Sequence, residues 1–224
     1  VEQKQLGQKG LIEVKDDEIF FSKTVKGTTK VKKEDEAKPK IDRTKQIAAA
    51  RQYLIEVAGQ ITHPVLRQWC FEIIRSDDFQ TCTASKRIHQ AYEGGLMVHT
   101  AEVMQLAMAM AGTVCVKANL DVIITSIIFH DVGKTFDYKT KDDGTFEYTK
   151  HQELVRHLPR SYAIFMSRTS PHLDEETRLQ IAHCIMSHHG RQEWGSPVLP
   201  QTPEAYLVHC ADWISSNSTM DYWE

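Results

Sequence analysis

Residues 130–134 read His-Asp-Val-Gly-Lys and place an imidazole, a carboxylate and an amine at the end of an apolar segment, residues 123–129. Imidazole and carboxylate side chains bind divalent cations. Because adjacent helical residues point about 100° apart, the imidazole and the carboxylate can converge on one ion only where the helix ends. Gly133 is expected to turn the chain sharply and return Lys134 to that ion. A solvated helix end is the plainer alternative, but the apolar neighbours favour a functional group.

Three other apolar segments carry side chains of the same kind. His99 lies within one, Asp212 lies in the middle of another, and the pair His188-His189 ends the third. A lone buried histidine more often has an ordinary hydrogen-bond partner, whereas a buried carboxylate such as Asp212 needs a cation or a donor. Imidazole and carboxylate ligands without a cysteine pair are typical of sites for Mn, Fe, Co or Ni, and less typical of Zn or Mg. We therefore expect a site for a divalent transition-metal ion.

Helices must position these side chains. Apolar periodicity predicts helices that begin near residues 44, 64, 95 and 119, and others that span about 150–168, 174–189 and 203–217. Thr44, Asn119 and Asp174 are expected to cap three of them. Residues 136–149 alternate around an Asp-Asp-Gly-Thr turn, which predicts a hairpin. The expected fold class is mostly α, a helical bundle with one small β-hairpin.

The N-terminal part differs from the rest. Residues 1–45 are rich in charge and poor in apolar side chains, and residues 32–40 are typical of a solvated linker. Residues 11–14 and 18–21 flank an acidic turn and are compatible with a short hairpin. We expect residues 1–45 to form a charged segment or linker and residues 46–224 to form the main domain.

Composition excludes some classes of protein. The 224 residues hold 27 Lys+Arg and 30 Asp+Glu, so the formal net charge of −3 does not indicate a globally basic nucleic-acid binder. No apolar run reaches the roughly 18 residues of a membrane helix, and no secretory signal opens the chain, so no membrane partner is expected. Five cysteines without paired spacing favour a reduced, cytoplasmic protein. The sequence does not predict an oligomeric state.

The order of the candidate ligands resembles a known family. Three segments carry the likeness, residues 89–100 (HQAYEGGLMVHT), 130–134 (HDVGK) and 187–197 (SHHGRQEWGSP). Together with Asp212 they resemble the HD-domain metal-dependent phosphohydrolase superfamily, and within it the YhaM-type 3′–5′ exoribonuclease group, over roughly residues 60–217. The His-Asp dipeptide alone is weak evidence, whereas the ordered set with the Trp-Gly-Ser-Pro loop is specific. The resemblance implies an HD-domain helical bundle for residues 46–224.

The resemblance also implies roles for the matching residues. It assigns two metal sites that share Asp131 as a bridging carboxylate. The ligands of the first site would be His99, His130, Asp131 and Asp212. The ligands of the second site would be Asp131, His157 and His188, with His189 as a further candidate. His157 departs from the family's usual Gly-His pair because Arg156 precedes it, and His151 remains the competing ligand. If neither binds, the site would hold one ion. Asp131 and Lys134 would be the catalytic residues, and Lys134 would either stabilise charge on the phosphate or aid the leaving oxygen.

Three side chains outside the ligand sets are expected to contact the substrate. His89 could touch the phosphate or brace a ligand, Arg191 could contact the substrate, and Trp194 could stack a base. A plainer alternative stays open for each of them. These alternatives are an ordinary loop histidine, a solvated arginine and a tryptophan that packs its own loop.

The resemblance implies a phosphodiester hydrolase, with 3′–5′ exonuclease action on single-stranded RNA or DNA as the leading hypothesis. The alternatives are hydrolysis of nucleotides or cyclic dinucleotides by the same centre, a di-iron HD oxygenase, and a non-catalytic HD module of a larger protein. The exoribonuclease group also carries an N-terminal OB-fold that grips RNA. Residues 1–45 show only two strand-like segments, too few for a five-stranded barrel. This departure puts processive RNA degradation in doubt but not the hydrolytic site.

Overall fold

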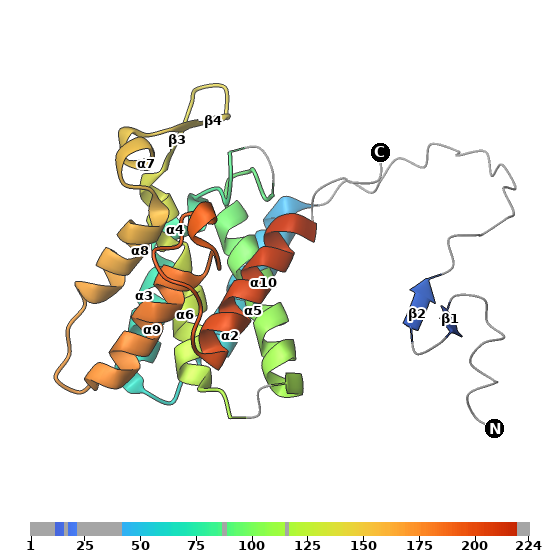
Figure 1. The fold of residues 1–224 in the computed structure, drawn as a ribbon. Helices are drawn as coiled ribbons and strands as arrows, with labels where there is room; N and C mark the ends of the chain where they lie inside the picture. Colours follow the sequence, from blue (N-terminus) through green and yellow to red (C-terminus); the bar gives the residue numbers. More distant parts are fainter. Residues whose placement is uncertain (1–11, 16–17, 22–41, 87–88, 115–116, 219–224) are drawn as a thin grey trace, which may run out of the picture. The chain divides into compact units, whose positions relative to one another are not determined.

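The structure, a computed structural model, describes residues 12–15, 18–21, 42–86, 89–114 and 117–218 (Figure 1). The chain divides into two units, residues 1–40 and 41–224, which are considered separately. In the first unit, strands β1 (Ile12–Lys15) and β2 (Glu18–Phe21) pair in antiparallel fashion, with Ile12 opposite Phe21. Most of the segment predicted to be a charged linker lies outside the described residues.

The second unit is mostly helical, which confirms the predicted fold class. Its helices are α2 (Arg43–Ala58), α3 (Pro64–Arg75), α4 (Asp77–Thr81), α5 (Gly95–Val114), α6 (Leu120–His130), α7 (Lys150–Leu154), α8 (His157–Met166), α9 (Glu175–Ser187) and α10 (Pro203–Ser218). Two short 3₁₀ helices, η2 (Val132–Phe136) and η3 (Gln192–Trp194), follow α6 and α9. The predicted hairpin is present as strands β3 (Tyr138–Thr140) and β4 (Phe146–Tyr148), paired in antiparallel fashion.

Helix α6 is the central helix of the bundle. The Asn119 side chain caps it and accepts hydrogen bonds from the backbone N–H groups of Asp121 at 3.0 Å and Val122 at 3.3 Å. Every residue from Val122 to His130 is buried, as expected for a helix that is apolar on all sides. Helices α3, α5, α8, α9 and α10 pack against it. Because α6 ends inside the bundle, both His130 and Asp131 are buried.

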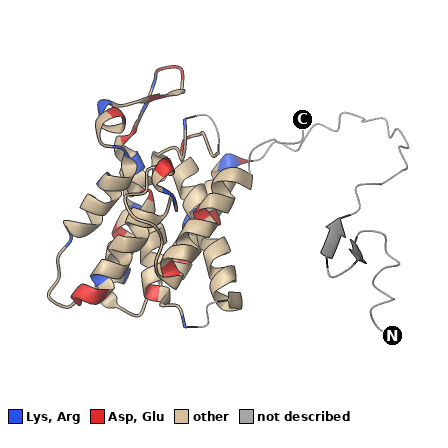
Figure 2. Cartoon of the chain, in the orientation of Figure 1, with Lys and Arg blue, Asp and Glu red and all other residues tan. Residues whose placement is uncertain are grey.

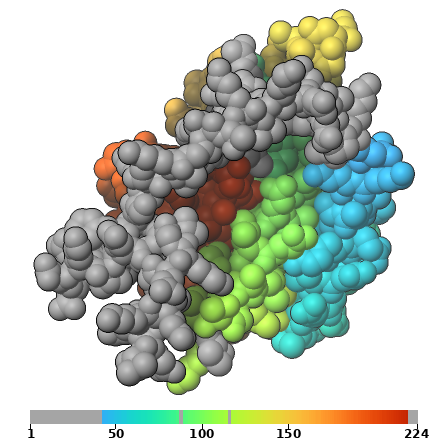
Figure 3. Space-filling view, turned by 90° about the vertical axis from the view of Figure 1, so that its right-hand side faces the viewer, coloured from blue at the N-terminus to red at the C-terminus, as the bar shows by residue number. Residues whose placement is uncertain are grey.

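Helices α5 and α10 are far apart in sequence but lie side by side. Figure 3 shows α10 in dark red against α5 in green, with the blue and cyan surface of residues 42–80 on the other side of α5. Contacts of α5 with both α10 and α2 agree with that view. This packing brings His99 of α5 next to Asp212 of α10, so two predicted ligands meet across one helix interface.

Two predicted details of the helices are wrong. The helix expected over residues 150–168 is divided into α7 and α8, because Arg156 has φ 65° and ψ 165°, a backbone conformation that favours glycine. The chain turns there, and His157 becomes the first residue of α8. The cap of α2 is Asp42 rather than Thr44, and the Asp42 side chain accepts a backbone hydrogen bond at 3.3 Å.

Surface charge is mixed in sign. Figure 2 shows acidic and basic residues interspersed along the helices of the described unit. Among the described residues, no helix is both long enough and apolar enough to cross a membrane. The cysteines that the structure describes at positions 70, 82, 184 and 210 are free thiols. A cytoplasmic location remains a prediction.

Candidate metal centre

The structure brings the predicted ligands together in two groups. The first group consists of His99, His130, Asp131 and Asp212, and the second consists of His157, His188 and His189. Within each group the ligand atoms lie within 4.8 Å of one another. The first group is built from α5, the end of α6, and α10, whereas the second is built from the start of α8 and the end of α9. Their proximity is therefore a product of the tertiary fold.

Asp131 lies between the two groups. Its Oδ2 is 3.4 Å from Nε2 of His99 and 3.3 Å from Nε2 of His130. Its Oδ1 is 3.4 Å from Nε2 of His157 and 3.8 Å from Nε2 of His188. One carboxylate thus offers a separate oxygen to each group, which is the geometry needed to bridge two ions.

Hydrogen bonds determine which ring nitrogen of each histidine is free. Nδ1 of His130, His188 and His189 lies 2.6, 2.7 and 2.8 Å, respectively, from a backbone carbonyl oxygen. A carbonyl oxygen only accepts, so each Nδ1 must carry the proton. In the neutral ring the lone pair is then on Nε2, the nitrogen that faces the centre. These histidines are held in the tautomer that binds a metal.

His99 is oriented by a chain of polar groups that the sequence did not reveal. Its Nδ1 lies 3.1 Å from Oγ of Ser215, and that hydroxyl donates to Oε2 of Glu102 at 3.0 Å. Because the hydroxyl gives its single proton to the carboxylate, it accepts from Nδ1 of His99. Gln90 donates to the same oxygen of Glu102 at 2.7 Å. In the neutral ring the lone pair of His99 is then on Nε2, which faces the carboxylates of Asp131 and Asp212.

Asp137 orients His157 in the way that Ser215 and Glu102 orient His99. Its Oδ2 lies 3.4 Å from Nδ1 of His157, and its Oδ1 lies 3.0 Å from Nδ1 of His151. The other ring nitrogen of His151 accepts a hydrogen bond from Nε of Arg160 at 2.9 Å. Both nitrogens of His151 are thus engaged with other residues, and it is His157 that lies within the ligand group. Asp137 is buried, and sequence reasoning did not single it out.

The residues present fit a divalent cation. The buried atoms without a hydrogen-bond partner include Nε2 of His99, His130 and His188, and Oδ1 of Asp131. Leaving such an atom unsatisfied costs about 1–3 kcal/mol. In addition, Nε2 of His157 and Nε2 of His189 lie only 3.1 Å apart. Cations coordinated by these atoms would satisfy all of them, and the set of imidazole and carboxylate ligands suits Mn, Fe, Co or Ni.

Charge in the centre is balanced around Asp131. Burial alone would raise the pKa of Asp131, but Lys134, whose Nζ lies 2.6 Å from Oδ2, and the nearby imidazoles hold that pKa well below its usual value. Burial would lower the pKa of Lys134, and Asp131 outweighs this and raises it. For His188, burial lowers the pKa well below the usual value, which keeps the ring neutral. The carboxylate is therefore ionised, the amine charged and this imidazole free to coordinate.

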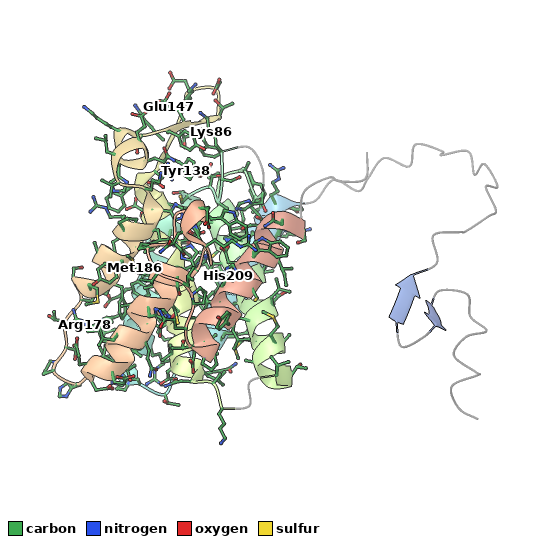
Figure 4. All side chains as sticks on the ribbon, viewed as in Figure 1. Lys86, Tyr138, Glu147, Arg178, Met186 and His209 are labelled. Carbon is green, nitrogen blue, oxygen red and sulfur yellow. The ribbon has the colours of Figure 1, made fainter. Side chains whose placement is uncertain are left out.

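Both groups open onto one pocket with a volume of about 640 Å³. Lys134, His89 and Trp194, which were predicted to contact the phosphate or the substrate, line it. Tyr138 and His209, labelled in Figure 4, also belong to the lining and were not predicted to contact the substrate. The two ligand groups therefore lie at the floor of the pocket, and several side chains able to contact a bound molecule line it as well.

Two of the predicted substrate contacts have specific surroundings. The His89 ring lies 5.1 Å from the His99 ring, centroid to centroid, and its pKa is lowered to about 4, chiefly by burial and then by Lys134. His89 is thus neutral at physiological pH. Arg191 does not line the pocket, and its guanidinium instead lies 4.8 Å from the centroid of the Trp194 ring.

We expect Asp137→Asn to weaken metal binding at the second group by about 10- to 100-fold, the usual effect of losing a side chain that orients a ligand. The amide keeps the shape of the carboxylate but loses the charge that faces Nδ1 of His157. Calorimetric titration with Mn²⁺ should show one site retained and one site weakened. Asp143→Asn, at an exposed carboxylate in the hairpin turn, is the matched control. Two unaltered sites in Asp137→Asn would contradict this role.

Comparison with known proteins identifies relatives of two named activities. The HD domain family profile matches residues 96–217. The dihydroneopterin 2′,3′-cyclic phosphate phosphodiesterase of Methanocaldococcus jannaschii is 32% identical over 175 residues, which cover 71% of this chain and 66% of that protein. The 3′-5′ exoribonuclease YhaM of Listeria welshimeri is 28% identical over 178 residues, which cover 75% of this chain and 53% of that enzyme.

The YhaM exoribonuclease of Bacillus velezensis is 26% identical over 189 residues, or 80% of this chain and 56% of that protein. The chain therefore spans between about half and two thirds of the length of these relatives. No solved structure matches it significantly. Since the family profile covers more than half of the chain, and relatives of both kinds share its sequence, the chain belongs to the HD domain family.

Proposed function

We propose that this chain is a metal-dependent phosphodiester hydrolase that removes nucleotides from the 3′ end of single-stranded RNA or DNA. The observation that carries the proposal is the position of Asp131, whose two oxygens face two separate groups of imidazole ligands at the floor of one pocket. Paired metal sites of this kind are typical of enzymes that hydrolyse phosphodiesters. Two of the relatives described above carry the name 3′-5′ exoribonuclease.

The two ligand groups would hold the ions, and Asp131 would be shared between them. When bound, the ions would lower the pKa of a water molecule and polarise the phosphoryl oxygens. Lys134 is charged and lines the pocket beside Asp131, so it would stabilise negative charge that develops on the phosphate. His89, neutral because of its lowered pKa, would form a hydrogen bond to the phosphate without adding charge.

The size of the pocket supports action at a chain end. A volume of about 640 Å³ is within the range of small-molecule sites, roughly 300–1,000 Å³. Such a space accommodates a nucleotide-sized group rather than several successive nucleotides. A terminal nucleotide bound there would present the phosphodiester that links it to the next nucleotide to the ligand groups.

A second candidate is hydrolysis of a small cyclic phosphodiester. The relative from Methanocaldococcus jannaschii, named for a dihydroneopterin 2′,3′-cyclic phosphate, supports it, and so does the same pocket volume. Cyclic nucleotides and cyclic dinucleotides belong to this chemical class.

Hydrolysis that persists under nitrogen would argue against a di-iron oxygenase, and any metal-dependent turnover would argue against a non-catalytic module.

We expect oligonucleotides labelled at the 5′ or the 3′ end to give different products when they are incubated with the protein and Mn²⁺. A 3′–5′ exonuclease leaves the 5′ label on a ladder of shortened chains and releases the 3′ label at once as a mononucleotide. Matching sets of internal fragments from both labels would contradict the exonuclease proposal. Parallel incubations with 2′,3′-cyclic AMP, dihydroneopterin 2′,3′-cyclic phosphate and a cyclic dinucleotide test the second candidate.

A further inference from the structure

One wall of the pocket is formed by a face of α10. His209, Trp213, Ser216 and Asn217 line the pocket, and residues at these spacings share one face of a helix. Asp212, a ligand of the first group, is adjacent to Trp213 in the chain and also lines the pocket. The wall therefore begins beside the ligand groups and continues along the helix.

Trp213 is the largest side chain of this wall and remains 49% exposed. A single exposed apolar residue is ordinary on a protein surface, but this one lines the pocket that also contains the two ligand groups. Within the described part of the chain, no aromatic ring or cationic side chain is placed against the Trp213 indole. Its ring is thus free to stack on a bound molecule.

Trp194, the tryptophan that the sequence singled out, is less free. The Arg191 guanidinium lies over its ring at 4.8 Å from the centroid. The His209 ring lies 6.5 Å away, centroid to centroid, at an interplanar angle of 41°. Trp194 therefore already has two neighbours, the Arg191 guanidinium and the His209 imidazole. These neighbours hold Trp194 beside the face of α10 that also carries Trp213.

We infer that Trp213 is the platform on which a flat heteroaromatic ring of the substrate stacks while its phosphodiester lies at the ligand groups. This inference rests on the proposed function, because it requires the phosphate to bind at the floor of the pocket. The ring class is either a nucleobase or a pterin, which share the planar π-face that an indole recognises. Trp213 determines specificity and takes no part in bond breaking.

The test compares Trp213→Ala and Trp213→Phe with the wild-type protein loaded with Mn²⁺. The substrates are 2′,3′-cyclic AMP, dihydroneopterin 2′,3′-cyclic phosphate and ribose 2,3-cyclic phosphate, which has no ring system to stack. For Trp213→Ala we expect KM to rise about 10- to 100-fold for a ring-bearing substrate, the range of base–aromatic stacking, with kcat nearly unchanged. KM for the ribose phosphate should stay the same, and Trp213→Phe should recover most of the loss.

Tyr206→Ala is the matched control, because Tyr206 is an aromatic residue of the same helix that is 56% exposed and does not line the pocket. It should leave every KM unchanged. The ring-bearing substrate that responds to Trp213→Ala identifies the ring as nucleobase or pterin. An unchanged KM for both of them, or an equal rise for the ribose phosphate, would overturn the inference.

Equilibrium binding separates failure of this inference from failure of the proposed function. AMP, neopterin monophosphate and ribose 5-phosphate are titrated into the same Mn²⁺-loaded proteins. If the wild type hydrolyses neither the labelled oligonucleotides nor the cyclic phosphodiesters, the proposed function fails. Tighter binding of AMP or neopterin monophosphate than of ribose 5-phosphate, lost in Trp213→Ala, would still support stacking. Equal affinity of the wild type and Trp213→Ala for both ring-bearing ligands would reject it.

Discussion

Asp131→Asn is expected to remove metal from both ligand groups and to reduce hydrolysis to the uncatalysed background. The carboxylate offers Oδ2 to His99 and His130 and Oδ1 to His157 and His188. The amide has a similar shape but carries no charge, and its nitrogen is a donor that cannot coordinate. The loss should exceed the roughly 10- to 100-fold reduction that follows removal of an outer, orienting side chain.

The same substitution leaves the buried amine of Lys134 without the carboxylate that lies 2.6 Å away. Breaking a buried ion pair from one side destabilises a protein by about 3–5 kcal/mol, so the midpoint of chemical denaturation should also fall. Elemental analysis and hydrolysis rates are therefore measured on protein shown by circular dichroism to be folded. Asp143→Asn again serves as the control. Full metal content with wild-type rates in Asp131→Asn would refute the bridging role.

Local sequence was sufficient to predict most helices because their signals are local. An apolar segment preceded by Asn119 predicts α6, and the Asn119 side chain does cap it. Asp174 likewise caps α9, where it accepts a hydrogen bond from the backbone N–H of Thr177 at 2.8 Å. Capping bonds join residues only two or three positions apart, so the residues that form them can be recognised in the local sequence.

The turn at Arg156 could not be predicted in this way. A φ of 65° is uncommon for a residue with a side chain, and nothing in the local sequence points to it. The cost of such a conformation is on the order of 1–3 kcal/mol, which tertiary contacts must offset. The family resemblance leads one to expect a glycine before His157, and the sequence has Arg156 there instead. The backbone of Arg156 nevertheless adopts the conformation that glycine favours.

The candidate site was predictable in its ligand types but not in its supporting residues. A histidine or an aspartate within an apolar segment is conspicuous, and the seven predicted ligands all lie in the two groups. Glu102, Ser215 and Asp137, which orient the ligands, are ordinary polar residues in the sequence. Their role depends on contacts such as Ser215 with Glu102, which are 113 residues apart, and only the fold reveals these contacts.

Gly133→Ala is expected to destabilise the fold by about 1–3 kcal/mol or more and to disrupt the second ligand group. Gly133 was expected to permit a sharp turn, but it has no positive φ, and the reason for glycine there is space. An added Cβ would lie 2.2 Å from the carbonyl oxygen of His157 and 2.8 Å from the backbone nitrogen of Ser161. Both are backbone atoms of α8, so relief requires the helix that begins with His157 to move.

Gly112→Ala is the matched control, since no neighbouring atom lies within 4 Å of a Cβ built at this exposed position of α5. There the same substitution should raise the free energy of unfolding by about 0.5–1 kcal/mol, because alanine favours a helix over glycine. Denaturation curves should therefore show lower stability for Gly133→Ala and higher stability for Gly112→Ala. Mn²⁺ titration should show the loss of a metal site in Gly133→Ala only. If Gly133→Ala keeps both sites and wild-type stability, α8 does not depend on this close approach, and the position of His157 must have another cause.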